Sequence, residues 1–214
     1  MAKYQRAYFP MKEIRLVQGY GKGTKTHAYG YPLDMNGKGA ATIEAVYAPF
    51  DCKITKLYQP KDTKTHANTV WLTSTVKVLC PNGYYGYLTV SITHPEGISK
   101  MKLGTTYKQG VQILKEGSTG YAEAPHIHLE VAKGEKAGWH SDHGQWIIDN
   151  GVKPEEYLFV REDAIIYKSN FKGNVGSLIK ESDITYKVKN VPSEPLIVRT
   201  LPWPLGKKIG ELIS

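Results

Sequence analysis

The stretch Pro125-His126-Ile127-His128-Leu129-Glu130-Val131 decides how this chain is interpreted. Successive side chains of a strand point to opposite faces, so we expect His126, His128 and Glu130 on one face and the apolar residues on the other. The apolar face predicts contact with a core. Two imidazoles side by side on rigid backbone can bind a transition metal, or divide metal binding and proton transfer between them. A pair of half-exposed surface histidines is the alternative for this motif taken alone.

The composition favours strands and turns over a helical bundle. The chain has 214 residues, of which 41% are hydrophobic, with 21 Gly, 15 Tyr and 12 Pro. This length allows one large domain, or a medium domain with a small one. The net charge of +8 suits an anionic partner such as nucleic acid, a membrane or a teichoic-acid-bearing bacterial wall, or serves only solubility. The lysines are scattered, so nucleic acid is the weakest of these interpretations.

Cysteine content and hydropathy indicate the cellular compartment in which the protein is made. Cys52 and Cys80 are the two cysteines, which fits a protein made in a reducing cytoplasm and argues against a disulfide scaffold. Residues 1–8 contain no apolar stretch, so no secretory signal is expected. The sequence contains no run of about eighteen apolar residues, so no membrane-spanning helix is expected.

The pattern along the chain predicts a mostly antiparallel sheet. Asn82-Gly83 is a strong hairpin-turn signal, and Pro154–Leu158 predicts a single helical turn. Residues 132–150 have no clean period and predict a loop-rich excursion. The expected strands lie in 13–20, 45–51 leading into 53–58, 69–73, 76–79, 84–93, 103–114 and 126–131.

Three other regions offer partners for the His-X-His strand. His27 and Asp34 flank a Gly-Tyr-Pro segment, and both residue types bind zinc. His94 ends a predicted strand, where a side chain can project from the rim of a sheet. His140 and His143 lie in the irregular segment.

The order of these residues resembles the lysostaphin-type zinc endopeptidases, which cut peptide bonds in bacterial cell-wall peptidoglycan. That family has a His followed by an Asp, a later His after a strand, a Gly-rich stretch and then His-X-His. The similarity covers roughly residues 13–131, and Val46-Tyr47-Ala48-Pro49 followed by Lys53-Ile54 also resembles the family's early core strands. The matching residues are His27, Asp34, His94, Gly104, Gly110, Gly117, Gly120, His126 and His128.

The resemblance implies a fold, a cofactor and residue roles. It implies a mainly β fold with an antiparallel sheet and an open groove, and a Zn²⁺ ion bound by His27, Asp34 and His128. Three protein ligands leave a fourth position open, as in catalytic zinc sites. His94 and His126 would form the catalytic pair, and which of them is the base stays open. The family commonly places its Asp four positions after the first His, whereas six residues separate His27 from Asp34 here. Gly30-Tyr31-Pro32 therefore has to form a bulge or loop.

Several of these residues also have a structural interpretation. His27 and Asp34 could be an exposed loop His and a turn Asp, and His94 is in register with apolar residues and could be a core His. Glu130 could orient a metal ligand or be a solvated carboxylate. A substrate groove could be lined by Tyr29, Tyr31, Trp139 and Trp146, or these residues could be structural anchors. A second metal site could be formed by His140 and His143, or both could be surface residues. His66 is expected to be a loop residue.

The C-terminal stretch 196–212 resembles the opening strands of bacterial SH3-like wall-binding modules. The sequence therefore predicts an endopeptidase domain at 1–160 and a small β segment at 161–214. Such a segment would raise the effective concentration of substrate if it bound wall.

The predicted function is zinc-dependent hydrolysis of peptide bonds in peptidoglycan, in a phage or prophage lysin or a virion-borne hydrolase. It would be made in the cytoplasm without a signal peptide and act at the wall after release. We expect no nucleic-acid partner and no membrane insertion. The main alternative is a catalytically inactive relative that binds wall or acts as a scaffold, and a basic nucleic-acid binder is the third interpretation. The sequence leaves open the bond that is cut and the oligomeric state.

Overall fold

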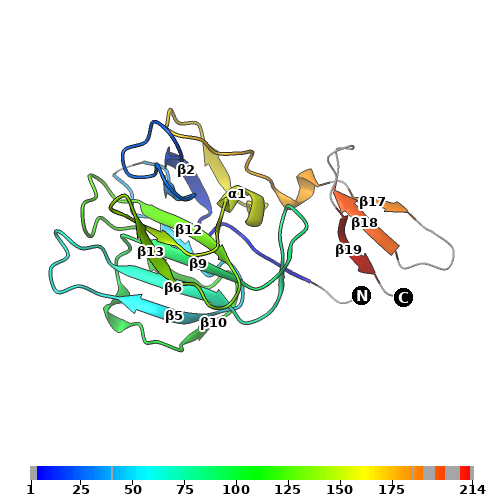
Figure 1. The fold of residues 1–214 in the computed structure, drawn as a ribbon, viewed down its shortest axis with the longest axis horizontal. Coiled ribbons are helices and arrows are strands. Elements are labelled where there is room, and N and C mark those ends of the chain that lie inside the picture. Colours follow the sequence, from blue (N-terminus) through cyan, green and yellow to red (C-terminus); the bar gives the residue numbers. More distant parts are fainter. Residues whose placement is uncertain (1–3, 40, 185, 190–195, 201–207, 213–214) are drawn as a thin grey trace.

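The computed structural model describes residues 4–39, 41–184, 186–189, 196–200 and 208–212. The main sheet contains β2 (Glu13–Gln18), β3 (Leu33–Asn36), β5 (Cys52–Tyr58), β6 (Thr69–Ser74), β9 (Leu88–Thr93), β10 (Thr106–Tyr107), β12 (Ile127–Lys133), β15 (Gly151–Val152) and β16 (Ile165–Tyr167). The strand order is β10-β5-β6-β9-β12-β3-β2-β16, and β15 pairs with β12. All pairs are antiparallel except β2 with β16 (Figure 1).

Shorter elements surround this sheet. β1 (Gln5–Arg6), β7 (Val78–Leu79) and β8 (Tyr85–Gly86) form one small sheet, β4 (Ala45–Tyr47) pairs with β11 (Gln112–Lys115), and β13 (Trp139–Asp142) pairs with β14 (Gln145–Ile148). The helical elements are η1 (Ile98–Lys100), α1 (Pro154–Tyr157) and η2 (Glu181–Asp183). The predicted mainly β fold is confirmed, as is the helical turn after Pro154. No helix in the described part of the chain is long and apolar enough to cross a membrane.

The main sheet has an apolar face and a polar face. Ile127, Leu129 and Val131 of β12 are almost completely buried in the main core, as the alternating pattern predicts. His128 and Glu130 lie on the opposite face. The hydrophobic face fixes the register of β12, because a slip by one residue would turn these apolar side chains away from the core.

Threonine pairs make burial of the polar face possible. The hydroxyls of Thr69 and Thr93 are 3.0 Å apart, and those of Thr73 and Thr89 are also 3.0 Å apart. Each pair joins neighbouring strands, and Thr69, Thr73 and Thr89 are buried. Buried hydroxyls that bond each other avoid the cost of an unmade hydrogen bond. The polar face can therefore be shielded from water close to the histidines.

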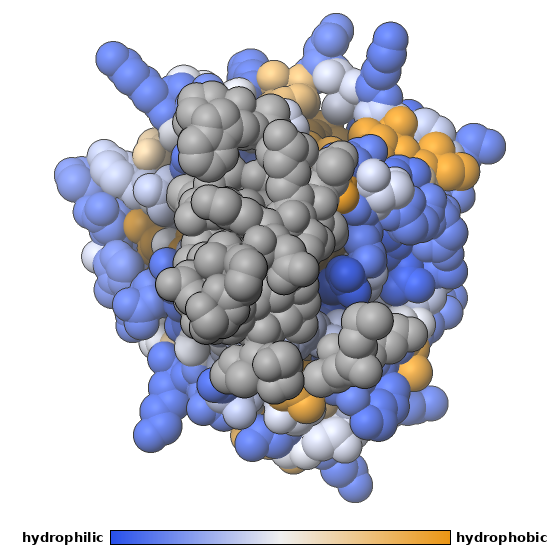
Figure 2. Space-filling model, turned by 90° about the vertical axis from the view of Figure 1, so that its right-hand side faces the viewer, coloured by the Kyte–Doolittle hydropathy of each residue, from blue (hydrophilic) through white to orange (hydrophobic). Residues whose placement is uncertain are grey.

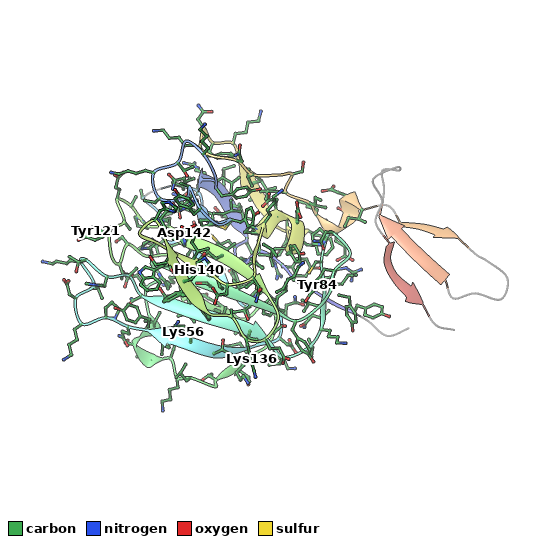
Figure 3. The ribbon with its side chains drawn as sticks, in the orientation of Figure 1. Lys56, Tyr84, Tyr121, Lys136, His140 and Asp142 are labelled. Atoms are coloured by element: carbon green, nitrogen blue, oxygen red, sulfur yellow. The ribbon has the colours of Figure 1, made fainter. Side chains whose placement is uncertain are left out.

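The prediction of a loop-rich excursion at residues 132–150 was wrong, because this segment forms the β13–β14 hairpin. Trp139 and Ile148 pair across the hairpin and pack against Trp71 of β6. The ammonium of Lys56 lies 4.4 Å from the ring centre of Trp71 and 3.9 Å from that of Trp139. On the other side Ile147 is buried. Ile147 and Ile148 are buried in succession whereas Trp146 is 67% exposed, so burial along the hairpin does not follow the alternation that marks a half-exposed strand. Figure 3 labels Lys56, and His140 on the hairpin.

Residues after 160 continue to pack on the main sheet. β16 pairs with β2, Gly19 N–H donates to the Lys172 carbonyl (2.8 Å), and Val160 N–H donates to the Ile179 carbonyl (2.7 Å). The predicted division at residue 160 is therefore not matched by a break in contacts. The described contacts with the main body continue to Glu181, whose Oε2 accepts the Tyr8 hydroxyl (2.9 Å), and the division into two domains stays a prediction.

The end of the chain forms a separate three-stranded sheet of β17 (Tyr186–Lys189), β18 (Leu196–Thr200) and β19 (Lys208–Leu212) (Figure 1). Around the grey atoms in Figure 2, this side of the molecule is mostly hydrophilic with small separate hydrophobic areas. The resemblance to an SH3-like module stays a prediction, and its residues 201–207 lie outside the described residues.

Several predicted strands are shorter than expected, among them 76–79, of which only Val78–Leu79 forms a strand, β7. The stretch 84–93 is divided at Tyr87 into β8 and β9, and β2 ends at Gln18 before the Gly-rich turn. Cys52 and Cys80 are both buried free thiols, as expected for a chain without a disulfide scaffold.

A buried carboxyl group in the main body predicts a pH-dependent stability. Glu116 is fully buried, its Oε1 accepts the Gly37 N–H (2.6 Å) and its Oε2 has no partner. Burial raises the pKa of Glu116 to about 7. The folded state therefore binds more protons than the unfolded state between about pH 4.5 and pH 7, so this group lowers stability as pH rises through that window.

We expect Glu116→Gln to remove this loss. The stability of the variant relative to the native protein should rise between pH 4.5 and pH 8, by at most about 3 kcal/mol at 1.36 kcal/mol per pKa unit. Urea unfolding at several pH values measures the difference. Glu123→Gln, at an exposed position, is the matched control. A pH-independent difference between Glu116→Gln and the native protein would contradict the prediction.

Candidate metal centre

The pairing of β3 with β12 places Asp34 directly opposite His128. On its other side, His128 is directly opposite Thr93 of β9. Directly opposed residues of antiparallel strands project their side chains to the same face, about 5 Å apart. The backbone thus brings the Asp34 carboxylate to the His128 ring without any help from a loop.

His27 reaches the same place from the connection between β2 and β3. Gly21 N–H donates to the His27 carbonyl (2.7 Å), and Gly30 has a φ of +70° that a glycine adopts without strain. Tyr31 packs edge-to-face on Tyr20 with ring centres 5.3 Å apart. The Gly30-Tyr31-Pro32 loop that the long spacing required is therefore present, and it returns the chain so that His27 and Asp34 meet. The His27 side chain is buried.

Three side-chain atoms converge on one point. His27 Nε2 lies 3.1 Å from His128 Nδ1 and 3.2 Å from Asp34 Oδ1, and His128 Nδ1 lies 3.0 Å from Asp34 Oδ1. Tetrahedral zinc with bonds of 2.0–2.1 Å separates its ligand atoms by about 3.3 Å. The donor set and its spacing therefore fit a zinc ion held by three protein ligands. In the described residues this is the one group of His, Cys, Asp and Glu side chains with such spacing.

Hydrogen bonding alone does not explain this convergence. His27 Nδ1–H donates to the Gly19 carbonyl (3.0 Å), so in the neutral ring Nε2 carries a lone pair. Asp34 Oδ1 also carries lone pairs. A single proton on His128 Nδ1 cannot bond both neighbours at full strength, so the cluster holds an excess of lone pairs facing inward. A divalent cation is the species that such an arrangement accommodates.

The charges of this cluster are strongly coupled. Burial works to raise the pKa of Asp34, but the close contacts of its carboxylate with the His128 and His27 rings outweigh it and hold that pKa well below its usual range. Burial lowers the pKa of His27. Burial also disfavours the charged form of His128, but the hydrogen bond and charge of Asp34 outweigh it and raise its pKa. Asp34 is therefore ionised at neutral pH, as a metal ligand requires.

We call the set of His27, Asp34 and His128 the metal triangle. His94 and His126 lie beside it. Their ring centres are 4.6 Å apart, and His126 Nε2 is 3.8 Å from Asp34 Oδ1. His94 Nδ1–H donates to the Thr119 carbonyl (2.6 Å), and His126 Nδ1–H donates to the Ala124 carbonyl (2.8 Å). Both rings therefore present Nε2 as the atom that can exchange a proton. Burial, together with the charges of neighbouring His128 and His126, lowers the pKa of His94 to about 4.

Glu130 is buried rather than solvated. Its Oε1 accepts the Ile148 N–H from the β13–β14 hairpin (3.0 Å), and its Oε2 lies 3.9 Å from His128 Nε2. The carboxylate thus faces the outer nitrogen of His128 while Nδ1 faces the triangle. At this distance Glu130 makes no hydrogen bond to His128, and it acts on that ring through its charge, which helps to raise the pKa of His128.

The other predicted residues lie apart from the triangle. Tyr29 stacks on His143 with ring centres 4.5 Å apart, and Tyr31 is 41% exposed beside the loop, so their role in binding substrate stays a prediction, as does the open groove. His140 and His143 bond Asp149 and Asp142 on the surface and join no metal cluster among the described residues. His66 is an exposed loop residue.

Sequence reasoning missed the groups that orient the histidines. Three of them are the backbone carbonyls of Gly19, Thr119 and Ala124, which leave no signal in side-chain identity. The Gly117-Ser118-Thr119-Gly120 turn gave an indirect signal, because its glycines permit close approach to the strand that ends at His94.

Comparison with known proteins yields partial likenesses. No family model matches the chain. The chain is 32% identical over 136 residues to Morphogenesis protein 1 of Bacillus phage B103, which covers 63% of this chain and 34% of that protein. The chain thus spans about a third of the length of the curated relative that it matches.

The mainly β fold is similar to several solved structures. It resembles the SpoIIQ–SpoIIIAH pore-forming complex (TM-score 0.48, 16% identity, 73% of this chain and 92% of that chain). It also resembles the catalytic domain of lysostaphin from Staphylococcus simulans (TM-score 0.39, 21% identity, 67% and 89%). A zinc-containing peptidase from Vibrio cholerae gives a TM-score of 0.42 at 17% identity, over 70% and 41%. These likenesses concern the fold alone.

The triangle predicts how two neighbouring substitutions differ. His128→Ala removes one of three ligands and should weaken zinc binding by at least about 100-fold, more than the loss of a partner outside the ligand set. His126→Ala removes no ligand and should keep zinc affinity within about tenfold. Competition with a chromogenic chelator measures both affinities. Equal affinities in the two variants would show that the ligands are assigned incorrectly.

Proposed function

We propose that this chain is a lysostaphin-type zinc endopeptidase that hydrolyses peptide bonds in bacterial peptidoglycan. One observation carries the proposal. His27 Nε2, Asp34 Oδ1 and His128 Nδ1 converge within 3.2 Å of one another, and two further histidines stand beside them with their Nε2 atoms free to exchange protons. Three protein ligands with an adjacent acid–base pair are what a hydrolytic zinc site needs, whereas a structural site is closed by a fourth protein ligand.

The chain's own residues divide the chemistry between them. Bound at the three ligands, zinc supplies a water of lowered pKa and polarises a carbonyl. His94 is neutral at pH 7, so its Nε2 can accept a proton or a hydrogen bond from the reacting group. His126 Nε2 stands nearer to Asp34 and can hold the second proton-transfer or oxyanion-stabilising position. The assignment of base and stabiliser between these two histidines stays open.

The choice of peptidoglycan as substrate has weaker but independent support. The sequence resembles the wall-cleaving family in the order of its five site residues. The net charge of +8 favours association with an anionic wall. Tyr29 and Tyr31, on the loop that carries His27, are the residues that we propose to contact the substrate.

The phage relative supports a phage role. Morphogenesis protein 1 of Bacillus phage B103 matches over a third of its length, and we infer that this chain acts on the wall as part of a virion or as a phage lysin. A wall-binding or scaffold protein without catalysis is the outcome to expect if the five residues meet but no bond is cut.

The test uses purified full-length chain and defined Gram-positive walls. Zinc-loaded protein should release muropeptides with new amino termini and no new reducing sugar ends, and mass spectrometry of the fragments identifies the bond. Prolonged treatment with a chelator should abolish release, because removal of zinc leaves His94 and His126 without a reactive water, and added Zn²⁺ should restore it.

Two controls sharpen this test. His128→Ala should release no muropeptides, and Asn82→Ala, in a remote turn where Asn82 Oδ1 accepts the Tyr84 N–H (2.9 Å), should behave as the native protein. Stoichiometric zinc without cleavage of any wall would sink the enzymatic proposal. Cleavage that survives complete zinc removal would sink the metal mechanism.

A further inference from the structure

His94 has a backbone conformation that a non-glycine residue rarely adopts. Its φ is +76°, and it is one of three such non-glycine residues in the part of the chain that the structure describes. The other two, His143 and Asn150, lie in the connections at the ends of the β13–β14 hairpin. His94 instead follows β9 and stands in the site. A left-handed residue persists only where its surroundings enforce it.

Asn68 holds the backbone on both sides of this strained residue. Its carbonyl accepts the His94 N–H (2.9 Å), and its side-chain Nδ2 donates to the Pro95 carbonyl (3.0 Å). Asn68 is buried at the start of β6. The backbone carbonyl and the side chain of Asn68 therefore act together on the turn that takes the chain out of β9 and directs the His94 ring toward the site.

Thr119 makes the remaining hydrogen bonds around Asn68 and His94. Its hydroxyl accepts the Asn68 N–H (3.0 Å), and its carbonyl accepts Nδ1–H of the His94 ring (2.6 Å). Asn68, His94 and Thr119 thus form a closed ring of hydrogen bonds that includes both the backbone and the imidazole of His94. Thr119 is buried as well, so water does not compete for these bonds.

The turn that carries Thr119 is held tightly against these residues. A Cβ at Gly117 would collide with the His94 carbonyl, and a Cβ at Gly120 would collide with the backbone of Ala67. The Gly117 carbonyl also accepts the His126 N–H (3.0 Å). The same turn therefore positions both histidines of the proposed acid–base pair.

We propose that Asn68 and Thr119 are positioning residues that hold His94 in its left-handed conformation and keep the proton on Nδ1, so that Nε2 faces the reaction. The claim on catalysis rests on the proposed function, whereas the claim on the His94 ring does not. Neither residue belongs to the metal triangle, so their loss should separate catalysis from zinc binding.

The test compares Asn68→Ala and Thr119→Val in the full-length zinc-loaded chain. Each should lower kcat for wall cleavage by roughly 10- to 100-fold, because a misplacement of about 1 Å can cost that much, while zinc affinity stays within about threefold. Thr119→Ser keeps the hydroxyl and should recover most of the lost activity. Asn82→Ala is the matched asparagine control and should be unchanged.

A spectroscopic readout tests the ring directly. The Nδ1–H of His94, protected by the Thr119 carbonyl, should give a slowly exchanging imidazole N–H signal in NMR spectra of the native protein, assigned by its loss in His94→Gln. The signal should broaden or disappear in Asn68→Ala and Thr119→Val, and remain in Thr119→Ser and Asn82→Ala.

The outcomes separate the two proposals. Retention of the signal and of activity in both Asn68→Ala and Thr119→Val overturns the positioning role. Loss of zinc in parallel with activity also overturns it, because the effect would then be a general disruption of the site. If Asn68→Ala does not fold, the Thr119→Val and Thr119→Ser pair decides. Failure of the native protein to cut any wall sinks the proposed function, and the NMR comparison still decides the positioning claim.

Discussion

The direct opposition of His128 and Asp34 across β12 and β3 is the constraint on which the site depends. Register is pinned on the far side of the sheet, where Ile127, Leu129 and Val131 are buried in the core. A slip by one residue would exchange the two faces, which would remove both the apolar packing and the opposition of His128 and Asp34. Hydrophobic packing on the opposite face therefore fixes the positions of the polar side chains, although it does not contact them. The stability of the site depends on the stability of the sheet.

This rigidity carries an electrostatic cost that zinc would relieve. His27 Nε2, Asp34 Oδ1 and His128 Nδ1 stand about 3 Å apart, and a single proton cannot satisfy all three contacts. Nδ1–H of His27 donates to the Gly19 carbonyl, and the Glu130 carboxylate lies 3.9 Å from Nε2 of His128. The contact between Asp34 and His128 lowers the pKa of the carboxyl group and raises that of the imidazole.

The sequence predicted the strands and the face of β12, because alternation records burial directly. It predicted less where packing or backbone conformation overrides alternation. His94 continues the alternation of Leu88, Val90 and Ile92, yet its φ of +76° turns it out of the strand. In the β13–β14 hairpin, Ile147 and Ile148 are buried in succession whereas Trp146 is 67% exposed, so burial there does not alternate. The carbonyls that orient the histidines have no sequence signature, since any residue supplies one.

The β13–β14 hairpin supports the long connection between His27 and Asp34. A longer connection between two ligands has more conformational freedom to lose, so it needs external support to hold a ligand in place. The hairpin supplies that support. Tyr29 N–H reaches Gln145 Oε1 (3.3 Å), the Tyr29 ring stacks on His143, and a Cβ at Gly30 would meet Ile147. The same hairpin donates the Ile148 N–H to Glu130 behind His128. The hairpin thus contacts the segments that carry His27 and His128, which are 101 residues apart in sequence. This contact explains how a connection longer than the spacing common in lysostaphin-type endopeptidases still brings His27 next to Asp34.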